Sequence, residues 1–245
     1  MRFGILSDIH ANYAALGVVL GEIDELGVDE IVCLGDVIGY YAEPRECLEV
    51  IMQRKIPAIR GNHERMVIGE INPDTKEGAV HVIEYTRAQL RNEHYTFIEQ
   101  EMTNKREHGE HFLMVHGSPR HKDEYLLSMQ AFIDNLKLLE QKWPQYKVCF
   151  HGHTHMPSVI APGHFIQRIH EDMVVPLQEG KHYLINPGSV GQPRDGCNRA
   201  SFAIYDEGEA SVYFYRREYD MDWTRQKARE AGFPDRVISR LEQGR

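Results

Sequence analysis

Residues 2–10 read RFGILSDIH, an apolar strand candidate that ends in Asp8 and His10. In an extended segment, side chains two residues apart lie on the same side of the backbone. By itself the pattern favours an aspartate that caps the next helix and a histidine that is merely exposed. The same arrangement, a short apolar segment followed by polar side chains, recurs four more times. This repetition determines how the whole sequence is interpreted.

The later polar clusters, with the strand candidate before each, are Asp36 after residues 30–34, Asn62-His63 after residues 56–59, His116 after residues 112–115 and His151-Gly152-His153-Thr154-His155 after residues 147–150. Aspartate is common in turns, so Gly35-Asp36 alone is weak evidence for a site. The three alternating histidines favour metal binding. In open α/β sheets, ligands bind beyond the carboxyl ends of the strands. The clusters are therefore predicted to face one crevice.

Helix candidates separate the first strands. Leu16, Val19, Leu20 and Ile23 recur with the 3.6-residue period of an amphipathic helix, which Gly27 ends. Further helices are predicted over residues 45–54, around 81–91, where a polar connection follows, and over 128–142, before Pro144. Alternation of strand and helix predicts an α/β fold with a largely parallel sheet covered by helices.

The pattern changes after His155, where short strand candidates are separated by Gly, Pro and polar turns. They span residues 158–161, 165–168, 174–177, 183–185, 201–205 and 210–216. We expect one mostly parallel sheet and a second, mixed or antiparallel sheet, with helices outside. No linker or repeat is evident, so residues 1–245 are predicted to form one domain. Residues 222–245 would be a C-terminal extension of two short helices, broken at Gly232-Phe233-Pro234.

Composition narrows the possible functions. The chain has 245 residues and a net charge of −9, which argues against binding to duplex nucleic acid. Its four cysteines form no C-x-x-C pair, and Cys33 and Cys149 lie in apolar runs that predict buried thiols. The start lacks the features of a signal peptide, and no apolar run approaches ~20 residues. We therefore expect a cytoplasmic protein that does not span a membrane.

Taken together, the motifs D-x-H, G-D, G-N-H-E, H and G-H-x-H resemble those of the calcineurin-like metallophosphoesterase superfamily, from Asp8 to about Arg194. Residues 7–12 (SDIHAN) and 186–191 (NPGSVG) are similar to the small bacterial and archaeal phosphodiesterase-type members. The resemblance implies a four-layer α/β-β/α sandwich: two mixed sheets flanked by helices, with a dimetal site between them at the carboxyl ends of the strands.

The resemblance also implies a set of metal ligands. One ion would be held by Asp8, His10 and His155, the other by Asn62, His116 and His153, and both by the bridging carboxylate of Asp36. These ligands offer nitrogen and oxygen without thiolate, which suits two divalent ions such as Mn, Fe, Ni, Co or Zn, with Mn the first candidate. His151 shares a face with the later histidines and is predicted to line the wall.

The implied reaction is direct attack on phosphorus by a hydroxide that bridges the metals. His63 and Asp36 are the predicted catalytic residues, with His63 assisting the leaving group. Arg194 and Asn12 are candidate substrate-binding residues, although Arg194 also fits an ordinary surface position and Asn12 a helix start. Tyr40 and Tyr41 either line the cleft or pack. No G-x-S-x-G elbow or phosphate-binding G-x-x-x-x-G-K-[ST] loop is present.

The segment after Asp36 distinguishes branches of the superfamily. Protein Ser/Thr phosphatases have G-D-x-V-D-R-G there, whereas this chain has Gly39 and Tyr40 in place of the second Asp and the Arg. We therefore predict a phosphodiesterase acting on small phosphoesters. Alternatives are a phosphomonoesterase, a dinucleoside polyphosphate hydrolase, or a non-catalytic metal-binding scaffold, with a nuclease less favoured. The sequence also leaves room for a homo-oligomer.

Overall fold

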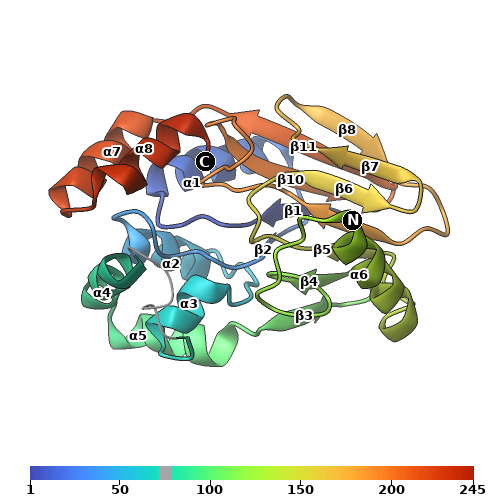
Figure 1. The fold of residues 1–245 in the computed structure, drawn as a ribbon, viewed down its shortest axis with the longest axis horizontal. Helices are drawn as coiled ribbons and strands as arrows, with labels where there is room; N and C mark the ends of the chain where they lie inside the picture. The colour runs from blue at the N-terminus through green and yellow to red at the C-terminus, as the bar shows by residue number, and fades with distance from the viewer. Residues whose placement is uncertain (72–78) are drawn as a thin grey trace.

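The computed structural model, which describes residues 1–71 and 79–245, has two β-sheets packed face to face between helices (Figure 1). The first sheet has the strand order β2-β1-β10-β11-β8 and the second β3-β4-β5-β9-β6-β7. The strands are β1 Arg2–Leu6, β2 Glu30–Cys33, β3 Lys105–His108, β4 Phe112–Val115, β5 Val148–Phe150, β6 Ser158–Ala161, β7 His164–Gln167, β8 Met173–Pro176, β9 Tyr183–Asn186, β10 Ala200–Asp206 and β11 Ser211–Arg217. The helices are α1 Tyr13–Leu26, α2 Pro44–Gln53, α3 Asn62–Val67, α4 Ala79–Gln89, α5 Asn92–Thr96, the π-helix η2 Phe97–Glu101, α6 Met129–Lys142, α7 Met221–Glu230 and α8 Asp235–Gln243.

Both sheets are mixed. The pairs β1–β2, β4–β5 and β5–β9 are parallel, and the other pairs are antiparallel. The expectation of one mostly parallel sheet is therefore wrong. Residues 56–59, a predicted strand, make only the isolated bridges Cys33–Ala58 and Ile59–Thr103. The first βαβ unit is consequently extended on its other side by β10, a strand from the end of the chain that pairs antiparallel with β1.

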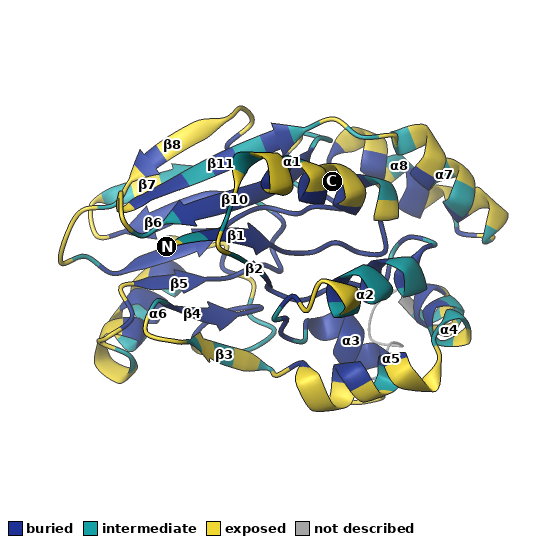
Figure 2. Cartoon of the chain, turned by 180° about the vertical axis from the view of Figure 1, so that it is seen from behind, coloured by how far each residue is buried: buried dark blue, intermediate teal, exposed yellow. Residues whose placement is uncertain are grey.

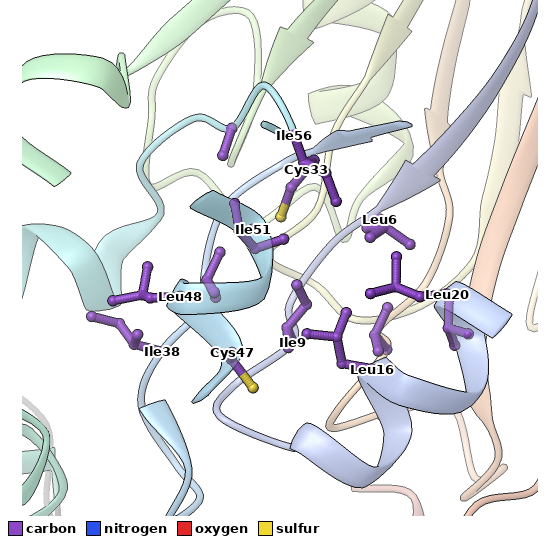
Figure 3. Packing of buried hydrophobic residues seen from close by; sticks show 14 of the residues in the cluster. Leu6, Ile9, Leu16, Leu20, Cys33, Ile38, Cys47, Leu48, Ile51 and Ile56 are labelled. Atoms are coloured by element: carbon purple, nitrogen blue, oxygen red, sulfur yellow. The ribbon is translucent and has the colours of Figure 1, made fainter. Parts of the chain in front are cut away.

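Alternation along the strands produces the layers. Phe3 and Ile5 of β1 point between the sheets, where they join an apolar cluster with Phe112 and Phe150 of the second sheet. Leu6 points the other way, toward α1 and α2. Figure 3 shows Leu16 and Leu20 of α1 and Leu48 and Ile51 of α2 gathered around Leu6 and Cys33.

Helix α6 covers the outer face of the second sheet through Phe132, Leu136 and Leu139. The predicted four-layer α/β-β/α sandwich is thus confirmed. Cys33 and Cys149 are fully buried in these clusters, as their apolar surroundings in the sequence predicted. Among the described residues, none of the helices has the length and apolar character that a membrane crossing requires.

The C-terminal helices α7 and α8, whose outer faces are exposed in Figure 2, form a small core with the loops after β1 and β2. Phe233, Ile238 and Leu241 pack against Ala11 and Tyr41 in this core. Their break at residues 231–234 lies where the sequence placed it. These helices cover loops that lead into and out of the polar clusters. That residues 1–245 form one domain stays a prediction.

Candidate metal centre

The predicted polar clusters follow the carboxyl ends of their strands and lie close to one another. Asp8 and His10 follow β1, Asp36 follows β2, His116 follows β4, and His153 and His155 follow β5. Their ligand atoms form two groups, within each of which every atom lies within 4.8 Å of the others. The first group is Asp8, His10, Asp36 and His155, and the second is Asp36, His116 and His153. Asp36 belongs to both groups.

Distances within the groups are short. In the first, His155 Nε2 lies 3.2 Å from Asp8 Oδ1, and His10 Nε2 lies 3.6 Å from Asp36 Oδ2. In the second, His116 Nε2 lies 3.4 Å from the same Asp36 oxygen. Asn62 joins this second group, since its Oδ1 lies 3.4 Å from His116 Nε2. Each of these side chains is buried.

The histidine tautomers fit cation binding. His10, His116 and His155 each direct Nδ1 at a backbone carbonyl oxygen, at 3.2, 2.8 and 2.5 Å respectively. A carbonyl oxygen can only accept a hydrogen bond, so Nδ1 carries the proton and Nε2 presents its lone pair. Histidine ligands in metal sites are commonly oriented in this way. The Nε2 atoms of His10 and His155 face each other at 3.2 Å, a contact that a cation between them would stabilise.

The backbone around the centre is strained. Asp8, His10, Asp36, His153 and His155 all have positive φ, between 51° and 65°. Non-glycine residues in this left-handed region each cost about 1–3 kcal/mol, and such residues cluster at functional sites. Here these left-handed residues follow the strand ends, where the side chains of Asp8, Asp36 and His155 come together.

Glu64 is a supporting residue that the sequence interpretation did not single out. Its fully buried carboxylate accepts hydrogen bonds from the backbone N–H groups of Asp36, Val37, Ile38 and Gly61, at 2.8 to 3.2 Å. It therefore joins the loop after β2 to the start of α3. The fourth position of the G-N-H-E motif was the available signal.

Gly61 permits a close approach at the same place. A Cβ at this position would lie 2.1 Å from Asp36 Oδ1, well inside van der Waals contact. Asp36 Oδ1 also accepts the backbone N–H of His63 at 2.9 Å. Asp36 is thus fixed by two hydrogen bonds, one from the backbone N–H of His63 to its carboxylate and one from its own N–H to Glu64. Gly61 leaves the space that the Asp36 carboxylate occupies.

Residues 1–210 match the model of the calcineurin-like phosphoesterase superfamily domain. The chain belongs to this superfamily. It is 35% identical to the uncharacterized protein MJ0912 of Methanocaldococcus jannaschii over 98% of this chain and 97% of that protein. The crystal structure of a metallophosphoesterase from Sphaerobacter thermophilus matches all of both chains with 36% identity and a TM-score of 0.83.

The hypothetical protein PH1004 from Pyrococcus horikoshii has the same fold, with a TM-score of 0.77 and 19% identity over all of this chain and 98% of that one. The superfamily match, together with the two groups of ligand atoms, makes the protein a metal-dependent phosphoester hydrolase with a dinuclear divalent metal site. The resemblance inferred from the motifs is confirmed.

Electrostatics in this phosphoesterase favour a cation. Burial opposes ionisation of Asp36, yet the imidazoles of His116 and His63 hold the pKa of its carboxyl well below the usual value. Burial likewise disfavours a charged His116, but Asp36 outweighs it and raises the pKa of His116 to about 9. Buried carboxylates therefore stabilise positive charge here. A divalent ion would meet the same carboxylates, in competition with protons.

The other candidate residues lie around the phosphoesterase centre in different roles. Arg194 is half-buried and donates through Nη2 to the Tyr40 hydroxyl at 3.2 Å, next to the first ligand group. Asn12 is fully buried and caps α1, its Oδ1 accepting from Ala15 N and its Nδ2 donating to a backbone carbonyl. A contact between Asn12 and substrate stays a prediction. Tyr41 is fully buried and packs in the core, whereas Tyr40 lies beside the first ligand group.

His151 belongs to neither ligand group. Its ring is buried, and Nδ1 lies 3.4 Å from Asn186 Nδ2. Burial lowers the pKa of His151 to about 4, which keeps the imidazole neutral near pH 7. This placement agrees with the prediction of a wall residue behind the metal centre.

Proposed function

We propose that this phosphoesterase hydrolyses phosphodiesters at a two-metal centre that prefers Mn²⁺. Asp36 would bridge the ions, and the two ligand sets would be Asp8, His10 and His155 for one ion and Asn62, His116 and His153 for the other. The single observation that carries this proposal is the membership of Asp36 in both groups of ligand atoms. Nitrogen and oxygen donors without thiolate suit Mn²⁺.

Two divalent ions supply Lewis acidity, which lowers the pKa of water and neutralises charge on phosphoryl oxygens. The chain supplies the rest. The ring of His63 lies 4.7 Å, centroid to centroid, from those of His10 and Tyr40, beside the first ligand group. From there His63 would give a proton to the leaving oxygen. Its backbone N–H, bound to Asp36, fixes the start of α3 and so the position of the ring.

Gly39 supports a function other than protein dephosphorylation. Its φ is +86°, and a Cβ there would lie 2.0 Å from His63 Nδ1. A side chain at this position, such as the aspartate of protein phosphatases, would collide with His63. The chain therefore cannot form the aspartate–histidine pair of the protein phosphatases, and this supports the phosphodiesterase proposal.

The proposal is tested with bis(p-nitrophenyl) phosphate and p-nitrophenyl phosphate, each assayed with Mn, Ni, Co, Zn and Mg. We expect metal-stimulated turnover that a chelator abolishes, with a higher kcat/KM for the diester. A higher kcat/KM for the monoester would refute the diesterase proposal and show that the enzyme is a phosphomonoesterase. Metal binding without turnover of either compound would favour a scaffold.

A further inference from the structure

Three side chains connect the two ligand groups across the metal centre. The Tyr40 ring centroid lies 4.6 Å from that of His10, in the first group. The Tyr125 ring centroid lies 3.8 Å from that of His153, in the second group. Arg194 hydrogen-bonds to Tyr125 and, at 3.2 Å, to the Tyr40 hydroxyl. We call Tyr40, Arg194 and Tyr125 the rim.

Tyr125 is held in place by a braced loop, residues 116–128 between β4 and α6. Two residues before Tyr125, Asp123 forms an ion pair with the fully buried guanidinium of Arg65, in which Arg65 Nη1 donates to Asp123 Oδ2 at 2.9 Å. Glu124 accepts hydrogen bonds from Ser118 Oγ at 2.5 Å and from Asn135 Nδ2 at 3.0 Å. The loop is therefore fixed on two sides at the point where it presents Tyr125.

The Tyr125 side chain is nevertheless 40% exposed. A ring that served only to pack would gain more from burial. A fixed, partly exposed aromatic ring next to an arginine is the arrangement that binds flat rings, because aromatic rings stack on tyrosine and on the planar guanidinium group.

We propose that Tyr125 stacks on a planar aromatic group carried by the ester arm that is not cleaved, so that the enzyme selects diesters with an aryl or nucleobase substituent. This inference rests on the proposed phosphodiesterase function. His63 and Tyr40 lie together at the first ligand group, where the leaving arm is proposed to depart. The second arm of a diester then extends toward His153 and meets Tyr125. Base–aromatic stacking tolerates different rings, since every base has a π-face.

The test compares two diesters that release the same p-nitrophenolate: bis(p-nitrophenyl) phosphate and methyl p-nitrophenyl phosphate. The retained arm is aromatic in the first and a methyl group in the second. The measured quantity is the ratio of their kcat/KM values with Mn²⁺. Differences in intrinsic reactivity are the same for every variant and cancel when ratios are compared.

We expect Tyr125→Ala and Tyr125→Leu to lower this ratio by about 5- to 150-fold, the range that stacking energies imply. Leucine keeps apolar bulk without a flat face, and so protects the test if the alanine variant misfolds. Tyr125→Phe should keep the ratio. Tyr13→Ala is the matched control, because Tyr13 is also 40% exposed but begins α1 outside the rim.

Calorimetry provides a second readout with phenyl phosphate and methyl phosphate, two monoesters that differ only in carrying an aromatic or a methyl substituent. The wild-type protein should bind phenyl phosphate more tightly, and Tyr125→Leu should remove that preference. An unchanged kcat/KM ratio and binding preference in Tyr125→Leu would overturn the stacking role and leave the phosphodiesterase intact. Absence of diester turnover in the wild-type protein would refute the proposed function, while the binding preference would still decide the role of Tyr125.

Discussion

Replacing Gly61 with alanine would disturb the position of Asp36 without removing any ligand. Gly61 has φ −84° and ψ −171°, a conformation open to alanine, so the backbone adds no strain. The added Cβ would lie 2.1 Å from Asp36 Oδ1 and 2.6 Å from Asp36 N. Since nonbonded heavy atoms settle at ~3.5–4.0 Å, the carboxylate must retreat by more than about 1 Å.

A displacement of this size predicts a loss in both metal affinity and rate. Misplacement of a catalytic group by 1 Å can cost ~10²-fold in rate, so we expect kcat/KM to fall at least about 100-fold in Gly61→Ala. Overpacking of this kind also costs about 1–3 kcal/mol in unfolding free energy. Because Asp36 belongs to both ligand groups, the variant should lose metal at both sites together.

The assay combines diester turnover, elemental analysis of metal content and urea denaturation, which separates a site effect from unfolding. Gly21→Ala is the control. A Cβ at Gly21, in the exposed face of α1, would meet nothing within 4 Å, and alanine there should stabilise the helix by about 0.5–1 kcal/mol. A folded Gly61→Ala protein with both metals and wild-type turnover would refute the bridging role of Asp36.

Three further predictions follow from the surrounding residues. His63→Ala should lower kcat by ~10²–10⁴-fold while metal content stays near normal; loss of a metal would show that His63 is a ligand. Arg194→Ala should mainly raise KM, and an unchanged KM would show that Arg194 does not bind the substrate. Burial lowers the pKa of His151 to about 4, below its unfolded value. The contribution of neutral His151 to the free energy of unfolding is therefore complete above about pH 6.5. It is lost progressively as the pH falls from about 6.5 to about 4. His151→Gln should accordingly lose less unfolding free energy than wild type between these pH values in urea titrations, and equal losses would contradict the shift.

Local sequence signals located most elements. The strand candidate at residues 112–115 is β4 as predicted, and the helix predicted over 128–142 begins after its cap, Ser128. These succeed because alternation, periodicity and capping act within a few residues. The polar connection predicted after residues 81–91 was wrong, since that segment contains α5, η2 and the strand β3, Lys105–His108. This polar edge strand exists through its pairing with β4, and nothing in its own sequence specifies that partner.

The sequence also did not predict which strands belong to which sheet. It depends on long-range pairing, such as that of β10 with β1. The candidate ligands, in contrast, were located by motif, and the structure brings them into two groups around Asp36. Their individual roles stay predictions. Tyr125 was missed because it lies in a polar loop without periodicity, and its approach to His153 depends on the distant Arg65.

The number of divalent ions that each chain retains shows whether the protein has a two-metal centre. The protein would be loaded with Mn²⁺, passed through a desalting column and analysed for metal, alongside an Asp36→Asn variant shown to be folded. We expect two ions per wild-type chain and weaker binding of both ions in the variant. One ion in the wild-type chain, or two retained by Asp36→Asn, would contradict this expectation.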